Sequence, residues 1–80
     1  MKNGIIETFY PDGKTVWLRE NYKAGELEGE RFGYREDGKV SWRENWKAGK
    51  LEGESLWYYE DGKTVRWREN YKARKLVESK

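Results

Sequence analysis

The sequence predicts an all-β protein: a single-layer antiparallel meander of three consecutive β-hairpins with about six strands. Asp–Gly pairs begin at positions 12, 37 and 61, so they recur at intervals of 25 and 24 residues. A fixed period of this length is typical of repeat proteins. After each pair the side chains alternate with a period of two, as in a β-strand, and glycine-containing turn signals separate the alternating segments.

The composition limits both the core and the chemistry. The chain has 80 residues, of which 40% are charged and 35% hydrophobic, so we expect a small core. Five Trp and six Tyr supply the bulk that aliphatic residues do not. Cys and His are absent, which removes disulfides, thiolate metal sites, the commonest metal ligand and the usual general base. We therefore expect no metal, no cofactor and no enzymatic activity, in a cytoplasmic protein.

The repeats are expected to form one domain over residues 1–80. A half unit covers 1–11, and units begin at 12, 37 and 61. The first strand of each predicted hairpin falls in 5–11, 30–36 or 54–60, and the second in 16–23, 40–47 or 65–72. No apolar run is long enough for a transmembrane helix or a secretory signal, so we expect no membrane association.

The hairpin loops are predicted from their turn residues. In the first loop, Pro11 presets φ at the second position of a type I turn, Asp12 suits the third, and Gly13 takes the positive φ that follows. The later Asp–Gly pairs repeat this three-residue loop without the proline. The first and third units contain one extra residue, which we expect to be absorbed as a β-bulge at Lys14–Thr15 and at Lys63–Thr64.

Ala–Gly pairs are expected to turn the chain back between units, at Ala24–Gly25 and Ala48–Gly49. The last equivalent, Ala73–Arg74, lacks the glycine, and Glu78 stands where the next glycine would be. We expect this last unit to fray as a terminal cap, because terminal repeats are atypical.

Loop length predicts which residues share a face of the sheet. A three-residue loop places Tyr34 opposite Val40 and Phe32 opposite Trp42, both of which are apolar pairs. This register predicts an aromatic face composed of Phe9, Phe32, Tyr34, Leu56 and Tyr58, with Val16, Leu18, Tyr22, Val40, Trp42, Trp46, Val65, Trp67 and Tyr71.

The third unit shows a recognisable repeat pattern. Over 53–63 it reads Gly-Glu-Ser-Leu-Trp-Tyr-Tyr-Glu-Asp-Gly-Lys, with Glu69 and Tyr71–Lys72 downstream and Lys-Ala-Gly-Lys-Leu-Glu-Gly ending at Gly53. This pattern resembles the MORN repeat, most closely the bacterial variant found in YwqK-like antitoxin proteins, over nearly the whole chain. The resemblance implies one hairpin per repeat and a structural or binding role without catalysis. Arg74, Glu78 and the high Trp and Arg content depart from the pattern.

The face opposite the aromatic one is the candidate binding face. It is expected to gather arginines and aromatic residues from several strands: Trp17, Arg19, Arg31, Arg35, Arg43, Trp57, Tyr59, Arg66 and Arg68. Arg and Trp are common hot-spot residues in protein interfaces, so such a face suits a protein partner. Basic residues interleaved with stacking aromatics also suit single-stranded nucleic acid. A third explanation is a solvated face whose Arg–Glu pairs keep the sheet soluble.

Three glutamates, Glu20, Glu44 and Glu69, recur at one position of the aromatic face. Equivalent residues lie two strands apart, or roughly 9.5–10 Å, at or beyond the outer limit for a pair of glycosidase carboxylates. We expect them to accept hydrogen bonds from Tyr hydroxyls, Trp N–H groups or turn amides.

These observations favour non-enzymatic binding of a macromolecule, by a protein-binding inhibitor or antitoxin-like module that uses one face of the sheet. Single-stranded nucleic-acid binding through the Arg/Trp face is the alternative. The near identity of the repeated Arg-Glu-Asn blocks also leaves open an engineered or idealised scaffold without a natural target. A homodimer through the aromatic face or a sheet edge is a further alternative.

Overall fold

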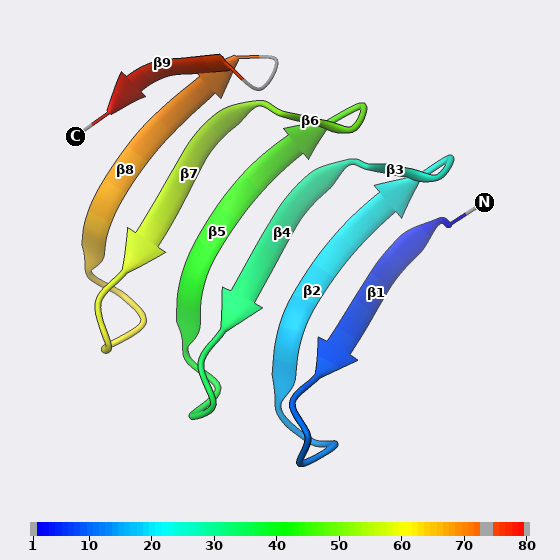
Figure 1. Ribbon diagram of the computed structural model, residues 1–80, viewed down its shortest axis with the longest axis vertical. Helices are drawn as coiled ribbons and strands as arrows, with labels where there is room; N and C mark the ends of the chain where they lie inside the picture. The colour runs from blue at the N-terminus through cyan, green and yellow to red at the C-terminus, as the bar shows by residue number, and fades with distance from the viewer. Residues whose placement is uncertain (1, 73–74, 80) are drawn as a thin grey trace.

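The computed structural model describes the backbone of residues 2–72 and 75–79 and the side chains of residues 2–72. The described residues form one open antiparallel sheet without a helix, which confirms the fold class predicted from the sequence (Figure 1). Its strands are β1 (Gly4–Phe9), β2 (Val16–Lys23), β3 (Glu26–Leu27), β4 (Gly29–Tyr34), β5 (Val40–Lys47), β6 (Lys50–Leu51), β7 (Gly53–Tyr58), β8 (Val65–Lys72) and β9 (Lys75–Ser79).

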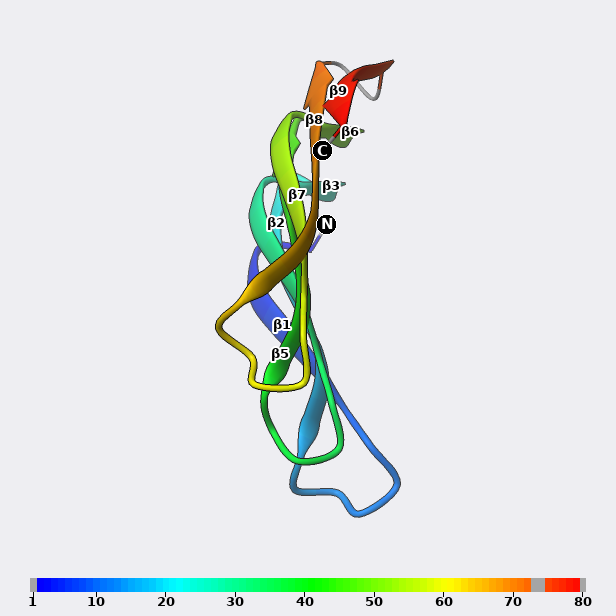
Figure 2. The same ribbon diagram turned by 90° about the vertical axis from the view of Figure 1, so that its left-hand side faces the viewer.

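The sheet is a meander in which each long strand pairs with the next one along the chain. The spatial order is β1-β2-β4-β5-β7-β8-β9, and the two-residue strands β3 and β6 pair with β2 and β5. The six expected strands are thus β1, β2, β4, β5, β7 and β8, and three short strands add to them. Figure 2 shows the sheet edge-on as a single twisted layer, in agreement with its extents of 36 × 35 × 14 Å.

The hairpin loops contain the turn predicted at each Asp–Gly pair. Gly13 has a φ of 69°, and its N–H donates to the carbonyl oxygen of Tyr10 over 2.9 Å. The same positive φ and the same bond recur at Gly38 and Gly62. Because an L-residue with a side chain rarely adopts this conformation, the glycine of each pair ends the turn.

The extra residues of the first and third units lie inside these loops. Asp12 accepts hydrogen bonds from the backbone N–H and the hydroxyl of Thr15, and Asp61 accepts the same two bonds from Thr64. The prediction of bulges at Lys14–Thr15 and Lys63–Thr64 is therefore wrong, because the aspartate side chain holds the additional residue within the loop.

A β-bulge does occur, at the same place in all three hairpins. In the second hairpin Tyr34 pairs with Val40, as predicted, but Gly33 pairs with Trp42, so that Ser41 is left over. The corresponding extra residues in the first and third hairpins are Trp17 and Arg66.

This bulge reverses the predicted faces of β1, β4 and β7. Phe32 pairs with Arg43, so the predicted Phe32–Trp42 pair is wrong. A register shift of one residue moves every side chain of a strand to the opposite face. The apolar residues expected on the tryptophan side therefore lie on the side of Arg43, together with the valines that pair with them: Phe9, Phe32, Tyr34, Leu56 and Tyr58.

The turns between units are the predicted Ala–Gly pairs, and each is tied to the preceding unit. Ala48 and Gly49 both have positive φ, of 49° and 78°. The N–H of Ala48 donates to the carboxylate of Glu28, and the N–H of Gly49 donates to the carbonyl of Leu27, both over 3.0 Å. The first turn repeats this arrangement: the N–H of Ala24 donates to the side-chain oxygen of Asn3, and the N–H of Gly25 donates to the carbonyl of Lys2. The third predicted turn, at Ala73–Arg74, lies outside the described residues.

Little of the chain is buried. Among residues 2–72, Leu56 is the buried apolar side chain, and Ser55 is the most buried polar one, at 1% exposure. A single-layer sheet has no second layer to cover it, so its stability depends on contacts between neighbouring side chains on each face. In the described residues no helix could cross a membrane.

Candidate functional site

One face of the sheet carries a row in which arginines alternate with apolar residues; we call it the arginine face. Across β2, β4, β5, β7 and β8, the row follows the strand pairings through Arg19, Phe32, Arg43, Leu56 and Arg68. The aliphatic stems of Arg43 and Arg68 flank Leu56, which explains why Leu56 is only 7% exposed. The stems of these arginines thus cover apolar side chains that a second layer would cover in a two-layer protein.

The guanidinium groups of the arginine face are neutralised by a matching row of glutamates. Arg19 lies 2.9 Å from Glu7, and the two other contacts, each 3.3 Å long, join Arg43 to Glu30 and Arg68 to Glu54. The Arg43 contact involves Nε and is an ion pair without hydrogen-bond geometry. Because every arginine of this row has an acidic partner, the face offers little net positive charge.

Arg31 lies on the opposite face, which carries Trp42, Trp46, Trp57 and Trp67 and which we call the tryptophan face. Its guanidinium donates to Glu20 over 2.8 Å and to Glu44 over 3.1 Å. The placement of Arg31 among the residues of the arginine face is therefore wrong, and so is that of Trp57, which pairs with Trp42. The bulge explains both errors, because it reverses β4 and β7.

The environment of Arg31 is partly buried and strongly acidic. Burial of the guanidinium lowers its pKa, but the hydrogen bonds and charges of Glu20 and Glu44 outweigh burial and raise the pKa above its ordinary value. The group also lies 5.1 Å from the centre of the Trp42 ring. Arg31 is thus a structural cross-link between β2, β4 and β5.

The expected role of the repeated glutamates is confirmed for Glu44 and Glu69, whereas Glu20 accepts its hydrogen bond from Arg31. Glu44 accepts a hydrogen bond from Trp46 Nε1 over 3.0 Å, and Glu69 accepts one from the Tyr71 hydroxyl over 2.9 Å. The bond to Glu69 raises the pKa of Tyr71, with burial and the negative charges as smaller causes. These carboxylates fix aromatic side chains on the tryptophan face.

Exposed aromatic residues gather at one corner of the sheet, where the β7–β8 hairpin ends in its loop. Two adjoining cavities lie there. One, of about 310 Å³, is lined by Trp57, Arg66 and Trp67. The other, of about 360 Å³, is lined by Arg35, Tyr58, Tyr59, Glu60 and Arg66. We call the residues of both cavities the corner site.

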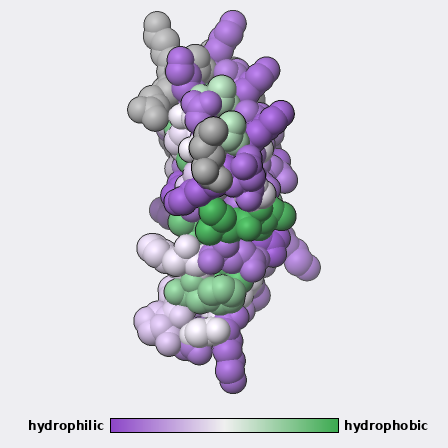
Figure 3. Space-filling model, turned by 90° about the vertical axis from the view of Figure 1, so that its right-hand side faces the viewer, coloured by the Kyte–Doolittle hydropathy of each residue, from purple (hydrophilic) through white to green (hydrophobic). Residues whose placement is uncertain are grey.

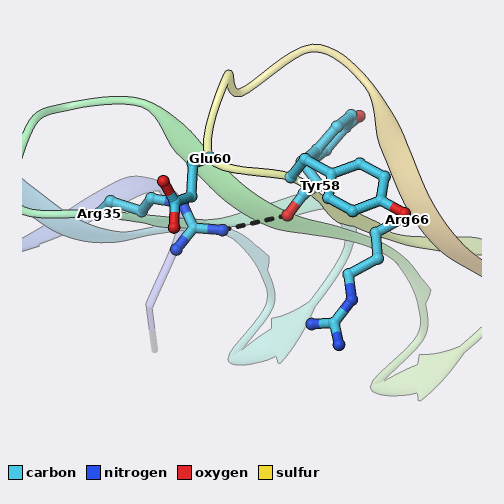
Figure 4. Close-up of a pocket in the computed structure, with 5 residues that line it drawn as sticks. Arg35, Tyr58, Glu60 and Arg66 are labelled. Carbon is cyan, nitrogen blue, oxygen red and sulfur yellow. Dashed lines mark hydrogen bonds between the residues drawn. The ribbon is translucent and has the colours of Figure 1, made fainter.

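Arg66 belongs to both cavities and is the feature that distinguishes this corner. It is the extra residue of the β7–β8 bulge, it is exposed, and it makes no hydrogen bond or ion pair within residues 2–72. Figure 4 shows Arg35 and Arg66 on opposite sides of Tyr58, with Arg35 donating to the Tyr58 carbonyl over 3.1 Å. Arg35 is therefore engaged, whereas Arg66 is available to a ligand.

Two aromatic residues of the corner site are open to solvent. Tyr59 is 51% exposed and Trp67 is 45% exposed. Trp57 pairs with Trp67 on the tryptophan face, and both side chains line the same cavity. An apolar group and a carboxylate presented together would find an aromatic surface and a free guanidinium within the same site.

Four of the nine predicted binding residues meet at the corner site: Arg35, Trp57, Tyr59 and Arg66. The arginine face holds three others, namely Arg19, Arg43 and Arg68, and Arg31 lies on the tryptophan face. Trp17 is 51% exposed in the first hairpin, where its ring lies 6.5 Å from that of Tyr10.

Sequence reasoning missed Trp67, Tyr58 and Glu60 as site residues. A signal was present, because the third hairpin departs from the other two at two positions of the corner site. Trp57 stands where the earlier units have Thr8 and Gly33, and Arg66 stands where they have Trp17 and Ser41.

No cluster of acidic residues in the described part of the chain could hold a metal ion. Comparison with protein-family models, curated proteins and solved structures gives no match.

Proposed function

We propose that this protein is a non-enzymatic module that binds a protein partner through the corner site. The observation that carries the proposal is Arg66, an exposed arginine without a partner in residues 2–72 that lines one cavity together with Trp57 and Trp67 and the next together with Tyr59. Trp, Tyr and Arg are the residues most enriched at interface hot spots.

The shape of the corner supports recognition of a short protein segment. A cavity of about 310 Å³ beside two indoles accommodates an apolar side chain, and Arg66 can pair with an acidic residue next to it. The strands that carry these residues are hydrogen-bonded into the sheet, so little ordering entropy is lost on binding. Inhibition of the partner, as an antitoxin or small inhibitor, is the form of binding that the MORN-like repeat pattern suggests.

Binding of nucleic acid through the arginine face has less support. That face would need several free cations, because phosphate contacts dominate the affinity for nucleic acid. Arg19, Arg43 and Arg68 instead each lie within 3.3 Å of a glutamate oxygen.

A peptide library tests the proposal while the partner is unidentified. Peptides selected from a displayed library on the immobilised protein are synthesised and their affinities measured by calorimetry. We expect Arg66→Glu to weaken binding by at least about tenfold, or about 1.4 kcal/mol. The matched control is Trp17→Ala, because Trp17 is the exposed bulge residue of the first hairpin and corresponds to Arg66 in the third. This variant should leave the affinity unchanged.

Three results would contradict the proposal. The selected peptides could bind the Arg66→Glu variant as well as the unaltered protein. The library could yield no binder, which would favour a scaffold without a target. Labelled single-stranded RNA or DNA could bind with a steep salt dependence, which would favour the nucleic-acid alternative.

A further inference from the structure

A row of polar side chains crosses the tryptophan face from β2 to β8, and we call it the carboxylate row. Its members, in strand order, are Glu20, Arg31, Glu44, Ser55 and Glu69. Ser55 pairs with Glu69 on one side, and the register of β7 on β5 puts Glu44 opposite it on the other. Serine therefore takes in the third unit the place that arginine takes in the second.

At its β1 end the carboxylate row is closed by an apolar residue. Ile6 pairs with Glu20, so this glutamate has a hydrocarbon side chain on one side and Arg31 on the other. Figure 3 faces the β1 edge and shows apolar patches on it. Among the described residues of the row, Glu44 and Glu69 are thus the neighbouring carboxylates without a cation between them.

The second unit shows what this spacing accommodates. The guanidinium of Arg31 reaches both of its glutamates, over 2.8 Å to Glu20 and 3.1 Å to Glu44. Glu44 and Glu69 are likewise two strands apart, or roughly 9.5–10 Å between backbones. One guanidinium can therefore bridge them as well. An ammonium suits this spacing less, because it is a compact charge without a planar fork of donors.

Both carboxylates have an oxygen left for such a group. On Glu44, the bonds from Arg31 and Trp46 both end on Oε1. On Glu69, the Tyr71 hydroxyl also bonds to Oε1. Oε2 of each glutamate accepts no hydrogen bond within residues 2–72. Glu44 is 18% exposed and Glu69 is partly exposed, so a ligand can reach them from solvent.

The side chain between the two carboxylates is polar and buried. Ser55 is 1% exposed, and its hydroxyl makes no hydrogen bond within residues 2–72. A buried hydroxyl without a partner is unfavourable. The two negative charges also act on one place: the bond to Glu69 is the largest cause of the raised pKa of Tyr71, and the charge of Glu44 adds to it.

We infer that Glu44, Ser55 and Glu69 form a subsite for an arginine side chain of the partner, which deepens the proposed function and rests on it. The guanidinium donates to Oε2 of both glutamates, and the serine hydroxyl offers a third acceptor. The subsite lies across β7, between β5 and β8, and so within the sheet.

The arginine subsite adjoins the corner site. Ser55 and Trp57 are two residues apart on one face of β7, or roughly 7 Å along the strand. The partner segment therefore presents an arginine next to the apolar residue that enters the cavity of Trp57 and Trp67. Its acidic residue pairs with Arg66, so the two charges of the segment bind at separate places.

A metal ion fits the arginine subsite less well. Calcium is bound by about 6–8 oxygen ligands, and magnesium requires near-ideal octahedral geometry. Two carboxylates held two strands apart, with one hydroxyl between them, supply neither.

The probe for this subsite is N-acetyl-arginine amide, which presents a guanidinium without the charges of a free amino acid. It is added to the whole protein at low salt, and NMR follows the indole N–H of Trp46 and the backbone amide of Ser55. The control ligand is N-acetyl-citrulline amide, which has almost the same shape without the charge. The test variant is Glu69→Gln, which keeps an oxygen for the Tyr71 hydroxyl.

The matched control variant is Glu54→Gln, because it removes a carboxylate from the same hairpin on the arginine face. We expect the arginine amide to shift both signals with saturation in the millimolar range, and the citrulline amide to shift neither. Glu69→Gln should weaken binding at least about tenfold. Glu54→Gln should leave the affinity unchanged.

The peptides selected from the displayed library extend the test to a protein partner. They should contain an arginine near their apolar residue. Citrulline in its place should weaken binding to the unaltered protein about tenfold, but should change little in Glu69→Gln, because the arginine and the carboxylate act as a pair.

Several results would overturn the arginine subsite. Absence of saturation would do so, as would equal shifts with citrulline amide, equal affinity in Glu69→Gln, or displacement of the arginine amide by calcium at lower concentration. Selected peptides that bind the corner site without an arginine would overturn the subsite and leave the proposed function standing. Saturable binding of the arginine amide with no binder in the library would support the subsite and contradict the proposed function.

Discussion

The indole ring of Trp42 lies directly on the backbone of Gly33. A Cβ atom at Gly33 would stand 2.2 Å from Cε2 and Nε1 of that ring, far inside van der Waals contact. The two residues are cross-strand partners on the tryptophan face, so the missing side chain of one makes room for the large side chain of the other.

Gly33→Thr should destabilise the protein by about 1–3 kcal/mol, because the new side chain would displace the indole from its contacts. Thermal unfolding followed by circular dichroism measures the loss. In the first unit the equivalent pair is Thr8–Leu18, with a smaller side chain opposite the threonine. The double variant Gly33→Thr, Trp42→Leu should therefore recover much of the stability. A double variant whose loss equals or exceeds the sum of both single losses would contradict the contact.

Arg31→Met should destabilise the protein by about 1–3 kcal/mol, because it leaves two partly buried carboxylates without their shared cation. Glu20 and Glu44 are 13% and 18% exposed, and each bonds to Arg31. Arg68→Met is the matched control on the arginine face. Its ion pair with Glu54 is more than 40% exposed on both sides, so its loss should cost about 0–1 kcal/mol in urea unfolding. Equal losses would show that Arg31 is not the cross-link described.

Tyr10→Phe removes the hydroxyl that joins the first loop to Tyr34 and should cost about 0.5–1.5 kcal/mol. Tyr59→Phe makes the same change in the third loop, where the hydroxyl has no partner within residues 2–72, and should leave the free energy of unfolding unchanged. Chemical denaturation of the two variants side by side makes the comparison. Equal effects would mean that the bond between loops contributes nothing.

The loop aspartates should make stability depend on pH in acid. The hydroxyl of Thr64, with the backbone amides of Lys63 and Thr64, lowers the pKa of Asp61 from 3.8 to about 2. Between these values the unfolded chain binds more protons at Asp61 than the folded chain, so stability rises with pH. The contribution is complete above pH 3.8 and is lost as the pH falls through about 2.

Thr64→Val removes the largest cause of this shift, so the pKa of Asp61 should rise towards its ordinary value. NMR titration of the Asp61 carboxyl carbon measures the pKa directly. Thr15→Val, the equivalent change beside Asp12, should leave the pKa of Asp61 where it is. An unchanged Asp61 in Thr64→Val would show that the hydroxyl does not hold the carboxylate.

The sequence predicts most of the fold, because the repeat period and the turn residues are local signals. Asp12–Gly13 and Ala48–Gly49 form the expected turns, and β2, β5 and β8 fall at the expected positions. The bulge at Trp17, Ser41 and Arg66 is not among the predictions, since the residues at these three positions differ in type and share no bulge signal. One such residue is enough to exchange the faces of a strand.

Because the bulge is not predicted, the sequence assigns some site residues to the wrong face of the sheet. It places Arg31 and Trp57 on the wrong face, and the predicted aromatic face includes Trp67, which is in fact 45% exposed. Gly33 is an available signal, because a glycine within a strand often marks a bulge or a close approach. The sequence predicts Arg66 as a binding residue by its type, and the structure adds that it lies in the bulge without a partner in residues 2–72.

The most direct measurement of the central claim follows the indole N–H signals of the five tryptophans while a selected peptide is added. If the corner site is the binding surface, the signals of Trp57 and Trp67 should shift, and those of Trp17 and Trp46 should stay in place. Shifts of Trp17 or Trp46 with Trp57 and Trp67 unmoved would place the partner elsewhere on the sheet and contradict the proposal.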